Sequence, residues 1–457
     1  MISGAAVLDR LEIQPWPATT AELTLPLVHF DMPWLYFHPV QRLLFFRLSS
    51  SSASQQFKET VVPRIRESLA TTLRHFLPLA GKIVIPSSSA RPFIRYDVGD
   101  SVPLVVAQTD KDFGYFVGDH PKVADDFHIC VPDLSPAKHF SDGIEYPVLA
   151  LQITLFPEKG YCLGLTNSHA IGDANSVVRF IKAWASACRF SGNDENPIER
   201  SSLPYLDRTA VEDPEGLDSI YWNQMKVRPQ TFESPPMKFP LNRVRSTFVL
   251  TRENIQSMKS FFLEKRPELP PITSFVAASA LIWSCLAKAD PEEVADGEPE
   301  YFGFAADGRS RLNPPVPNSY FGNCLIFIKA VTTHGALRGE EGFLTAAELI
   351  GEAIRAALQN ERGVLEGAET WMEQFFGLLG KRIFGIAGSP RFDLYDADFG
   401  WGSPEKYEAA SIDADTSMSL CKSRDLEGGL EVGLSRPAEI INPFTAIFHQ
   451  ELRKIST

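Results

Sequence analysis

A histidine and an aspartate stand four residues apart, at His169 and Asp173, in the stretch "YCLGLTNSHAIGDANS" (161–176). A hydroxyl group is a poor nucleophile at neutral pH until a base removes its proton, and imidazole, with a pKa of about 6.5, is the usual base. His169 comes where an apolar strand pattern ends and a helical pattern begins. Loops at strand ends are where mixed α/β proteins hold reactive groups. His169 is therefore a candidate general base, and Asp173 could hold the loop or orient the ring.

The same two residues also have a purely structural interpretation. Aspartate is a preferred first residue of a helix and contributes about 1 kcal/mol there without any catalysis. One His-x-x-x-Asp match arises readily by chance in a chain of 457 residues with nine histidines.

Other catalytic motifs do not compete with this pair. The sequence contains no G-x-S-x-G, no P-loop and no G-x-G-x-x-G. Cys324 could act as a nucleophile, but a buried core thiol is the more common role of such a cysteine. Without a covalent nucleophile, direct transfer from an already activated donor is the natural mechanism.

The composition narrows the range of partners. The formal net charge is −13, whereas a protein that grips a nucleic-acid backbone normally carries the opposite sign. The six cysteines are scattered without a C-x-x-C, which argues against a zinc site and indicates a reducing compartment. No signal peptide and no run of about 18 apolar residues is visible. We expect a cytoplasmic protein with no metal, no nucleic acid and no membrane partner.

The hydrophobic patterns predict an α/β fold in two domains. Strands are expected at 41–48, 147–156, 161–169, 246–251, 300–307, 325–331, 417–423 and 430–435. A helix is expected in the stretch 59–81, ending before Pro78 and Gly81, and further helices are expected at 173–190, 253–265 and 273–289. The polar, proline-rich stretch 191–245 is typical of a crossover, with a short helix near Tyr221–Met225. The expected division is an N-terminal domain at 1–195, a linker at 196–245 and a C-terminal domain at 246–457.

A second unusual stretch is "DFGWG" at Asp398–Gly402. Its acid, two aromatics and two glycines favour a tight turn held by aromatic packing, with Asp398 binding local backbone or an arginine. Arg309 and Arg311 follow the strand expected at 300–307, and an arginine here could pair with a buried aspartate such as Asp173.

Taken together, these stretches resemble the plant BAHD acyltransferases, which move an acyl group from a coenzyme A thioester to an alcohol or amine. The matching motifs are His169 to Asp173, "YFGN" at 320–323 and Asp398 to Gly402, and two motifs about 230 residues apart are more specific than either alone. The stretches "TLPLVHFDMPWL" (24–35) and "AGSPRFDLYDADFGWG" (387–402) are most similar to the branch that acylates flavonoid and other phenolic glycosides. Many members of that branch use malonyl-CoA.

The resemblance implies two chloramphenicol-acetyltransferase-like domains of mixed sheet plus helices, with a channel between them. His169 would be the general base, and Asp173 would pair with Arg309 and hold the loop in shape. Asp398 belongs to the second family motif, for which we keep the structural interpretation together with Phe399, Gly400, Trp401 and Gly402. No cofactor would be bound permanently, and malonyl-CoA would be a co-substrate.

The resemblance also points to residues that bind the donor. Arg179 matches an arginine of malonyl-using relatives, and a guanidinium suits a free carboxylate; on its own it would pass for a solvated helix residue. Lys259, Thr273 and Ser274 would contact coenzyme A, since a lysine and hydroxyls at a helix start suit phosphate. The sequence departs from close relatives at 270–272, where Pro-Pro-Ile lacks their histidine, and at Gly308, where many have cysteine.

These observations predict an acyl-CoA-dependent O-acyltransferase that transfers malonyl to a sugar hydroxyl of a phenolic or flavonoid glycoside, acting as a monomer. A hydroxycinnamoyl transferase of the same family and a non-catalytic small-molecule binder on the same fold are the alternatives. A condensation-type domain shares the histidine motif but is expected beside carrier modules.

Overall fold

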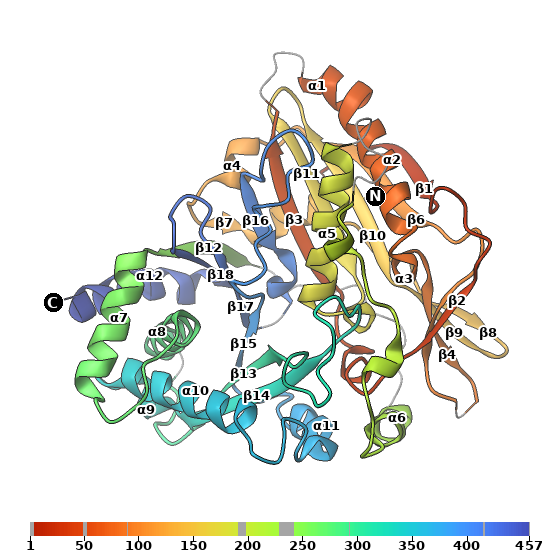
Figure 1. The fold of residues 1–457 in the computed structure, drawn as a ribbon. Coiled ribbons are helices and arrows are strands. Elements are labelled where there is room, and N and C mark those ends of the chain that lie inside the picture. The colour runs from red at the N-terminus through yellow and green to blue at the C-terminus, as the bar shows by residue number, and fades with distance from the viewer. Residues whose placement is uncertain are drawn as a thin grey trace.

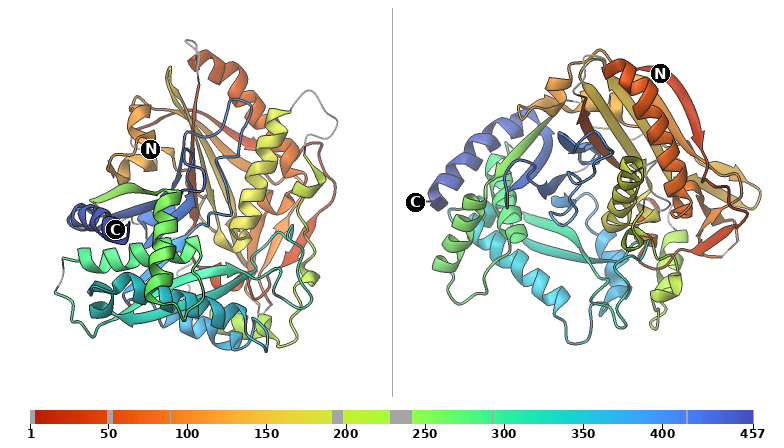
Figure 2. Two further views of the ribbon diagram at one scale, coloured as in Figure 1. Left: turned by 60° about the vertical axis from the view of Figure 1, so that its left-hand side comes forward. Right: turned by 45° about the horizontal axis from the view of Figure 1, so that its top comes forward.

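The computed structural model describes residues 4–48, 53–88, 90–190, 198–227, 242–291, 293–414 and 416–456. In this part of the chain, sheets of six, seven and five strands form the framework, and helices pack on them (Figure 1). The two largest hydrophobic cores lie at the six-stranded and the seven-stranded sheet. In both views of Figure 2 the C-terminal helix, in dark blue, lies well apart from the yellow-green helix that follows His169.

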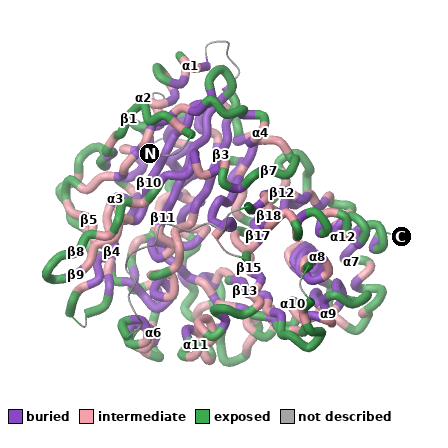
Figure 3. Tube along the Cα trace, turned by 180° about the vertical axis from the view of Figure 1, so that it is seen from behind, coloured by how far each residue is buried: buried purple, intermediate pink, exposed green. Residues whose placement is uncertain are grey.

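The six-stranded sheet contains the strands that lead to His169. Its order is β1-β6-β10-β11-β3-β16. Its strands are β1 (Ala6–Ile13), β3 (Val40–Arg47), β6 (Val102–Gln108), β10 (Leu149–Phe156), β11 (Gly160–Asn167) and β16 (Lys406–Ala409). β10 and β11 form the expected antiparallel hairpin, and all eight residues of each strand are buried, which explains their continuous apolar runs. Figure 3 shows this burial concentrated in the strands around β3, β10 and β11.

Two helices, α2 (Val62–Leu73) and α5 (Ala174–Arg189), lie side by side on one face of this sheet (Figure 1). Trp184 of α5 donates from Nε1 to the carbonyl of Ile65 in α2 at 3.2 Å. The helix expected in the stretch 59–81 is α2, which ends at Leu73, before Pro78 as expected, and a separate short α3 (Leu77–Ala80) follows. Pro78 has no amide hydrogen with which to continue the helical ladder, so the chain turns at Phe76.

The five-stranded sheet extends from the same core, and its order is β2-β5-β4-β9-β8. Its strands are β2 (Leu23–Pro26), β4 (Lys82–Pro86), β5 (Phe93–Tyr96), β8 (Lys138–Phe140) and β9 (Gly143–Pro147). The shorter helices of the chain are α1 (Ala53–Gln56), α4 (Phe113–Val117), α6 (Leu217–Lys226), α9 (His334–Arg338) and α11 (Trp371–Phe376).

The seven-stranded sheet organises the second half of the chain, in the order β14-β13-β15-β17-β18-β12-β7. Its strands are β7 (Lys122–Val123), β12 (Arg243–Leu250), β13 (Pro299–Asp307), β14 (Leu325–Thr333), β15 (Ile383–Ala387), β17 (Ser417–Lys422) and β18 (Leu430–Pro437). The long helices beside it are α7 (Arg252–Lys265), α8 (Ser274–Ala289), α10 (Gly342–Leu358) and α12 (Ala438–Ser456). None of the helices in the described ranges is both long and apolar enough to cross a membrane.

Two short strands cross the division that the sequence suggests. β7, from the first half, pairs with β12, and β16, from the second half, pairs with β3. In Figure 1 the blue β16 lies beside the dark red β3. A division into 1–195 and 246–457 therefore does not describe these segments, because backbone pairing places each in the other half's sheet. Of the expected linker 196–245, residues 198–227 contain α6, and residues 196–197 and 228–241 lie outside the described part.

Candidate active site

His169 lies on a one-turn 3-10 helix, His169–Ile171, between the end of β11 and the start of α5. Its ring stacks on Trp34, with centroids 3.9 Å apart and planes 13° apart, and meets the edge of Phe37 at 5.6 Å. Trp34 ends a second 3-10 turn, Met32–Trp34, that precedes β3. The imidazole is thus held in an aromatic setting, and its Nδ1 is buried without a hydrogen-bond partner in the described part of the chain.

This setting changes the protonation of His169. Its pKa is lowered to about 4, chiefly by burial; the positive charge of Arg42 acts in the same direction, and the carboxylate of Asp173 opposes the shift only in part. A histidine with a lowered pKa is neutral at physiological pH, which is the form that can accept a proton. The candidate base is therefore in its reactive form at physiological pH.

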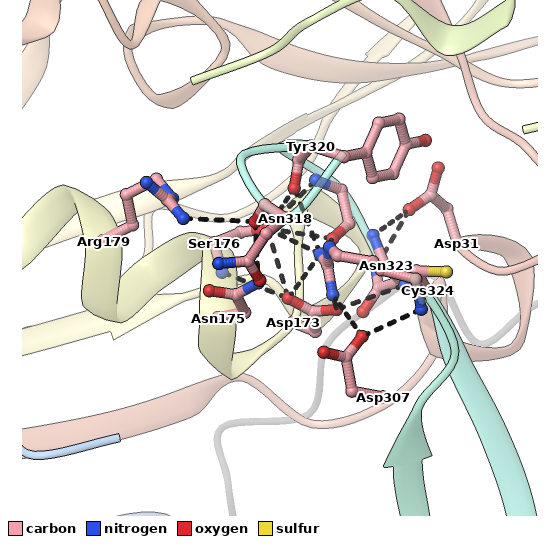
Figure 4. A network of polar contacts seen from close by, with 12 residues as sticks. Asp31, Asp173, Asn175, Ser176, Arg179, Asp307, Asn318, Tyr320, Asn323 and Cys324 are labelled. Carbon is pink, nitrogen blue, oxygen red and sulfur yellow. Dashed lines mark hydrogen bonds and ion pairs between the residues drawn. The ribbon is translucent and has the colours of Figure 1, made fainter. Parts of the chain in front are cut away.

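Asp173 is an anchor for the loop and not a partner of the imidazole. It caps α5, with Oδ1 accepting from the amide of Ser176 at 3.1 Å. Arg309 donates to both of its carboxylate oxygens, from Nη1 to Oδ2 at 2.7 Å and from Nη2 to Oδ1 at 3.0 Å. The amide of Cys324 donates to Oδ2 at 3.1 Å. With these donors, both oxygens of Asp173 are directed at the protein interior (Figure 4).

Arg309 connects this aspartate to the loop between β13 and β14. Its Nη2 also donates to the carbonyls of Tyr320 and Gly322, at 3.1 and 3.0 Å, and its Nη1 lies 3.0 Å from Asp307. Burial acts to lower the pKa of Arg309, but the carboxylates of Asp173 and Asp307 outweigh it and raise the pKa overall. The start of α5 and the "YFGN" segment are therefore held together by one buried cation.

The sequence patterns do not identify three buried residues that support the His169 loop. They are Asp31, Arg208 and Asn323. Asn323 donates from Nδ2 to the backbone carbonyl of His169 and to Asp31 Oδ1, each at 3.0 Å. Asp31 forms an ion pair with Arg208 at 3.3 Å, and Arg208 donates to the hydroxyl of Tyr320 at 2.7 Å. All three are buried. The sequence feature that could have identified Asp31 and Asn323 is their position in the stretches 24–35 and 320–323, which carry the family resemblance.

Arg179 lies on α5 but makes its contacts outside the His169 loop. Its guanidinium donates to the carbonyls of Ser201 at 2.6 Å and Asn318 at 3.1 Å. Figure 4 shows its side chain directed away from Asp173. Its Nε is buried with no partner in the described residues. The structure therefore does not bring Arg179 to the imidazole of His169.

The three residues expected at coenzyme A do come together. Lys259 of α7 donates from Nζ to the hydroxyl of Ser274 at 2.9 Å. Thr273 caps α8, with its hydroxyl accepting from the amide of Val276 at 3.2 Å. The result is an ammonium group and a hydroxyl at a helix N-terminus, an arrangement that favours an anion.

The Asp398–Gly402 motif is a tight loop packed on the six-stranded sheet. Asp398 accepts from the amides of Gly400 at 2.7 Å and Gly402 at 2.9 Å and lies 3.4 Å from Arg189. Phe399 is fully buried against Trp184, with ring centroids 5.1 Å apart. Trp401 lies under the guanidinium of Arg64, 5.1 Å from its ring centroid. These are the local backbone and arginine contacts that the structural interpretation requires.

Cys324 does not present a nucleophile. Its side chain is fully buried, and burial raises the pKa of its thiol. A protonated, buried thiol is inert, since the thiolate is the reactive form.

Trp34, on which His169 stacks, also lines a small pocket. Its walls come from the segment 29–34, from α6, from the strands β13 and β14, and from α11. It therefore lies between the two halves of the chain, and its lining is mostly aromatic.

Comparison with known proteins identifies the family. A model described as the transferase family matches residues 8–450. The chain is 41% identical to the malonyl-coenzyme:anthocyanin 5-O-glucoside-6'''-O-malonyltransferase of Salvia splendens, over 100% of this chain and 97% of that one. It is 42% identical to phenolic glucoside malonyltransferase 1 of Nicotiana tabacum, over 91% and 92% of the two chains.

Among solved structures, the crystal structure of vinorine synthase matches with a TM-score of 0.72 at 21% identity, covering 99% of this chain and 100% of that one. At this identity the match bears on the fold alone, and it confirms the two-domain α/β fold of mixed sheets and helices. The family match, the full-length relatives and the shared fold agree, and the chain belongs to the transferase family of BAHD acyltransferases.

Proposed function

We propose that this protein transfers a malonyl group from malonyl-CoA to a sugar hydroxyl of a phenolic or flavonoid glycoside. The observation that carries the proposal is the identity of about 40% to malonyltransferases over their full length, which the geometry at His169 complements. A neutral imidazole stacks on Trp34, which also lines an aromatic pocket between the two halves of the chain.

The proposed chemistry needs only the two substrates and His169. The imidazole accepts the proton of the sugar hydroxyl, and the oxygen attacks the thioester carbonyl. When the tetrahedral intermediate collapses, the carbon–sulfur bond breaks and the thiolate of coenzyme A takes the proton from the imidazolium. An ester and free coenzyme A are formed, and no covalent enzyme intermediate occurs.

Asp173, Arg309 and Asn323 act as positioning residues in this proposal. Arg309 holds Asp173 at the start of α5, and Asn323 holds the carbonyl of His169, so the histidine loop keeps one conformation. A misplaced base loses rate steeply, because catalysis by positioning depends on ångström-level geometry.

We assign the coenzyme A tail to Lys259, Thr273 and Ser274. The malonyl carboxylate is assigned to Arg179, and this role requires its guanidinium to exchange at least one carbonyl contact for the carboxylate. Malonyl-CoA and coumaroyl-CoA rates measured side by side test the donor, with Arg179→Ala as the variant. If Arg179→Ala keeps the full preference for malonyl-CoA, Arg179 is not the carboxylate site.

The decisive experiment incubates the purified protein with malonyl-CoA and a panel of phenolic glucosides and detects products by mass. We expect malonylated glucoside and free coenzyme A in equal amounts, and loss of both with His169→Ala. A protein without any transfer, and with His169→Ala identical to wild type, would be a binder and not an enzyme. Faster transfer from coumaroyl-CoA would assign it instead to the aromatic acyltransferases.

We further propose that the protein is a cytoplasmic monomer, since its net charge of −13 and its scattered cysteines suit a soluble protein in a reducing compartment. Light scattering on the purified protein tests the monomer, and a fluorescent fusion in plant cells tests the compartment.

A further inference from the structure

His29 is a buried histidine that the proposed chemistry does not use. It precedes the 3-10 turn that carries Trp34, and only 1% of it is exposed. Its Nδ1 lies 3.0 Å from Asp218 Oδ1, and its backbone amide donates to the same oxygen at 2.6 Å. Its Nε2 is buried and has no hydrogen-bond partner in the described part of the chain. The ring is therefore fixed by an aspartate at one nitrogen and left unsatisfied at the other.

The neighbouring carboxylates make this group a poor metal site, although His29, Asp213 and Asp218 lie close together. Asp213 already accepts from the amides of Leu217 and Asp218, at 2.6 and 3.0 Å. Asp218 Oδ2 pairs with Arg91, and its Oδ1 holds His29. A cation would have to displace these donors. Asp218 therefore holds the Nδ1 edge of the ring, and Nε2 has no hydrogen-bond partner in the described residues.

His29 lines an aromatic pocket that Trp34 also lines, and neither Asp213 nor Asp218 is among the lining residues. The other aromatic lining residues are Phe30, Trp34, Tyr221, Phe327, Trp371 and Phe375. Trp34 also stacks on His169. The pocket and the candidate base therefore share Trp34 as a common neighbour.

We propose that this pocket receives the aromatic ring of the acceptor and that Nε2 of His29 accepts a hydrogen bond from a phenolic hydroxyl on that ring. A pocket lined mostly by aromatic residues suits a flat ring, and a buried nitrogen without a partner in the described residues favours a ligand that hydrogen-bonds to it. His29 is then a specificity-determining residue, with Asp218 positioning it. The inference rests on the proposed function, because it takes the acceptor to be a phenolic glycoside.

The test compares phenyl β-glucoside with its 2-, 3- and 4-hydroxyphenyl analogues, with malonyl-CoA as donor. For wild type we expect at least one hydroxylated glucoside to exceed the phenyl parent about five- to tenfold in kcat/KM, the value of one buried hydrogen bond. The variant His29→Asn keeps an N–H for Asp218 but removes the Nε2 position. It should lose this preference, so that the phenyl glucoside and its hydroxylated analogues react with equal kcat/KM. His29→Gln, whose amide reaches the Nε2 position, should recover part of the preference.

Two results would overturn the assignment. In one, wild type shows no preference for any hydroxylated ring; in the other, His29→Asn slows all four glucosides equally while its unfolding temperature stays near that of wild type. Calorimetry measures the affinity for the same glucosides, and so the preference for a hydroxylated ring, without any transfer reaction. A wild type that binds the hydroxylated ring through His29 but transfers nothing would contradict the proposed function alone.

Discussion

Asp173 and Arg309 form a buried, two-point ion pair across the two halves of the chain. Nη1 and Nη2 of Arg309 lie 2.7 and 3.0 Å from the two carboxylate oxygens, and only 2% of each residue is exposed. The aspartate of the His-x-x-x-Asp motif thus belongs to the scaffold. Since the same arginine binds the carbonyls of Tyr320 and Gly322, the pair fixes where the histidine loop sits.

Asp173→Asn should destabilise the protein by about 3–5 kcal/mol, because it leaves Arg309 buried without its main counter-charge. Urea unfolding measures the loss. The matched control is Asp396→Asn, whose partner Lys182 is at the surface and whose side chain is 65% exposed; it should change stability by less than about 0.5 kcal/mol. Equal losses of unfolding free energy in the two variants would show that the buried ion pair stabilises the protein no more than a surface pair does.

The rate of transfer should stay high on the acid side of neutrality. Burial lowers the pKa of His169 to about 4, so the base stays neutral until the pH approaches that value. The acid limb of kcat/KM should therefore lie near pH 4 and not near the ordinary value of about 6.5. Between these two values the unfolded chain binds more protons than the folded one at His169, so this residue makes stability fall as the pH falls. An acid limb at 6.5 would contradict the burial of the ring.

Trp34→Leu should move that acid limb upward. The indole stacks on the imidazole at 3.9 Å and shields it from water. With the smaller side chain water reaches the ring, desolvation weakens, and the pKa of His169 rises towards about 6.5. The measurement is the pH profile of kcat/KM, with Phe376→Leu, an aromatic residue outside the His169 stack, as a control that should leave the limb in place. A loss of rate at every pH without any shift would mean that Trp34 only positions substrate.

Gly402→Ala should cost about 1–2 kcal/mol of stability through backbone strain alone. Gly402 has φ of +99°, a left-handed conformation that an alanine resists, and a Cβ there would meet no atom within 4 Å. Gly297 has the same open space without that backbone conformation, so Gly297→Ala should cause no loss. Thermal unfolding of the two variants gives the comparison, and equal melting temperatures would refute the strain.

Lys259→Ala should raise the KM for malonyl-CoA about three- to tenfold and leave kcat nearly unchanged, because the proposed phosphate contact stabilises ground and transition states alike. The control is Lys265→Ala on the same helix, whose partner is the exposed Glu264. Steady-state kinetics with varied malonyl-CoA measure both. A change in the KM for the glucoside, or none for malonyl-CoA, would place coenzyme A elsewhere.

The sequence by itself determined the local elements around the site. The uninterrupted apolar runs of β10 and β11 and the one-sided apolar pattern of α5 predicted a strand–loop–helix unit with His169 in the loop, and the structure has it. These elements can be predicted from local periodicity, because the spacing of apolar residues indicates which strand or which helix face is buried. The turn-forming glycines of the Asp398–Gly402 motif likewise marked a tight loop.

Only the tertiary structure decided what lies next to His169. Trp34 and Asn323 stand more than a hundred positions away from it in the chain, and no periodic signal links them to it. β16 joins the first sheet although it comes from the far end of the sequence, because strand pairing depends on which edge is free and not on chain order. The aromatic pocket that His29 and Trp34 line exists only once α6, α11 and the strands β13 and β14 have packed against the segment 29–34.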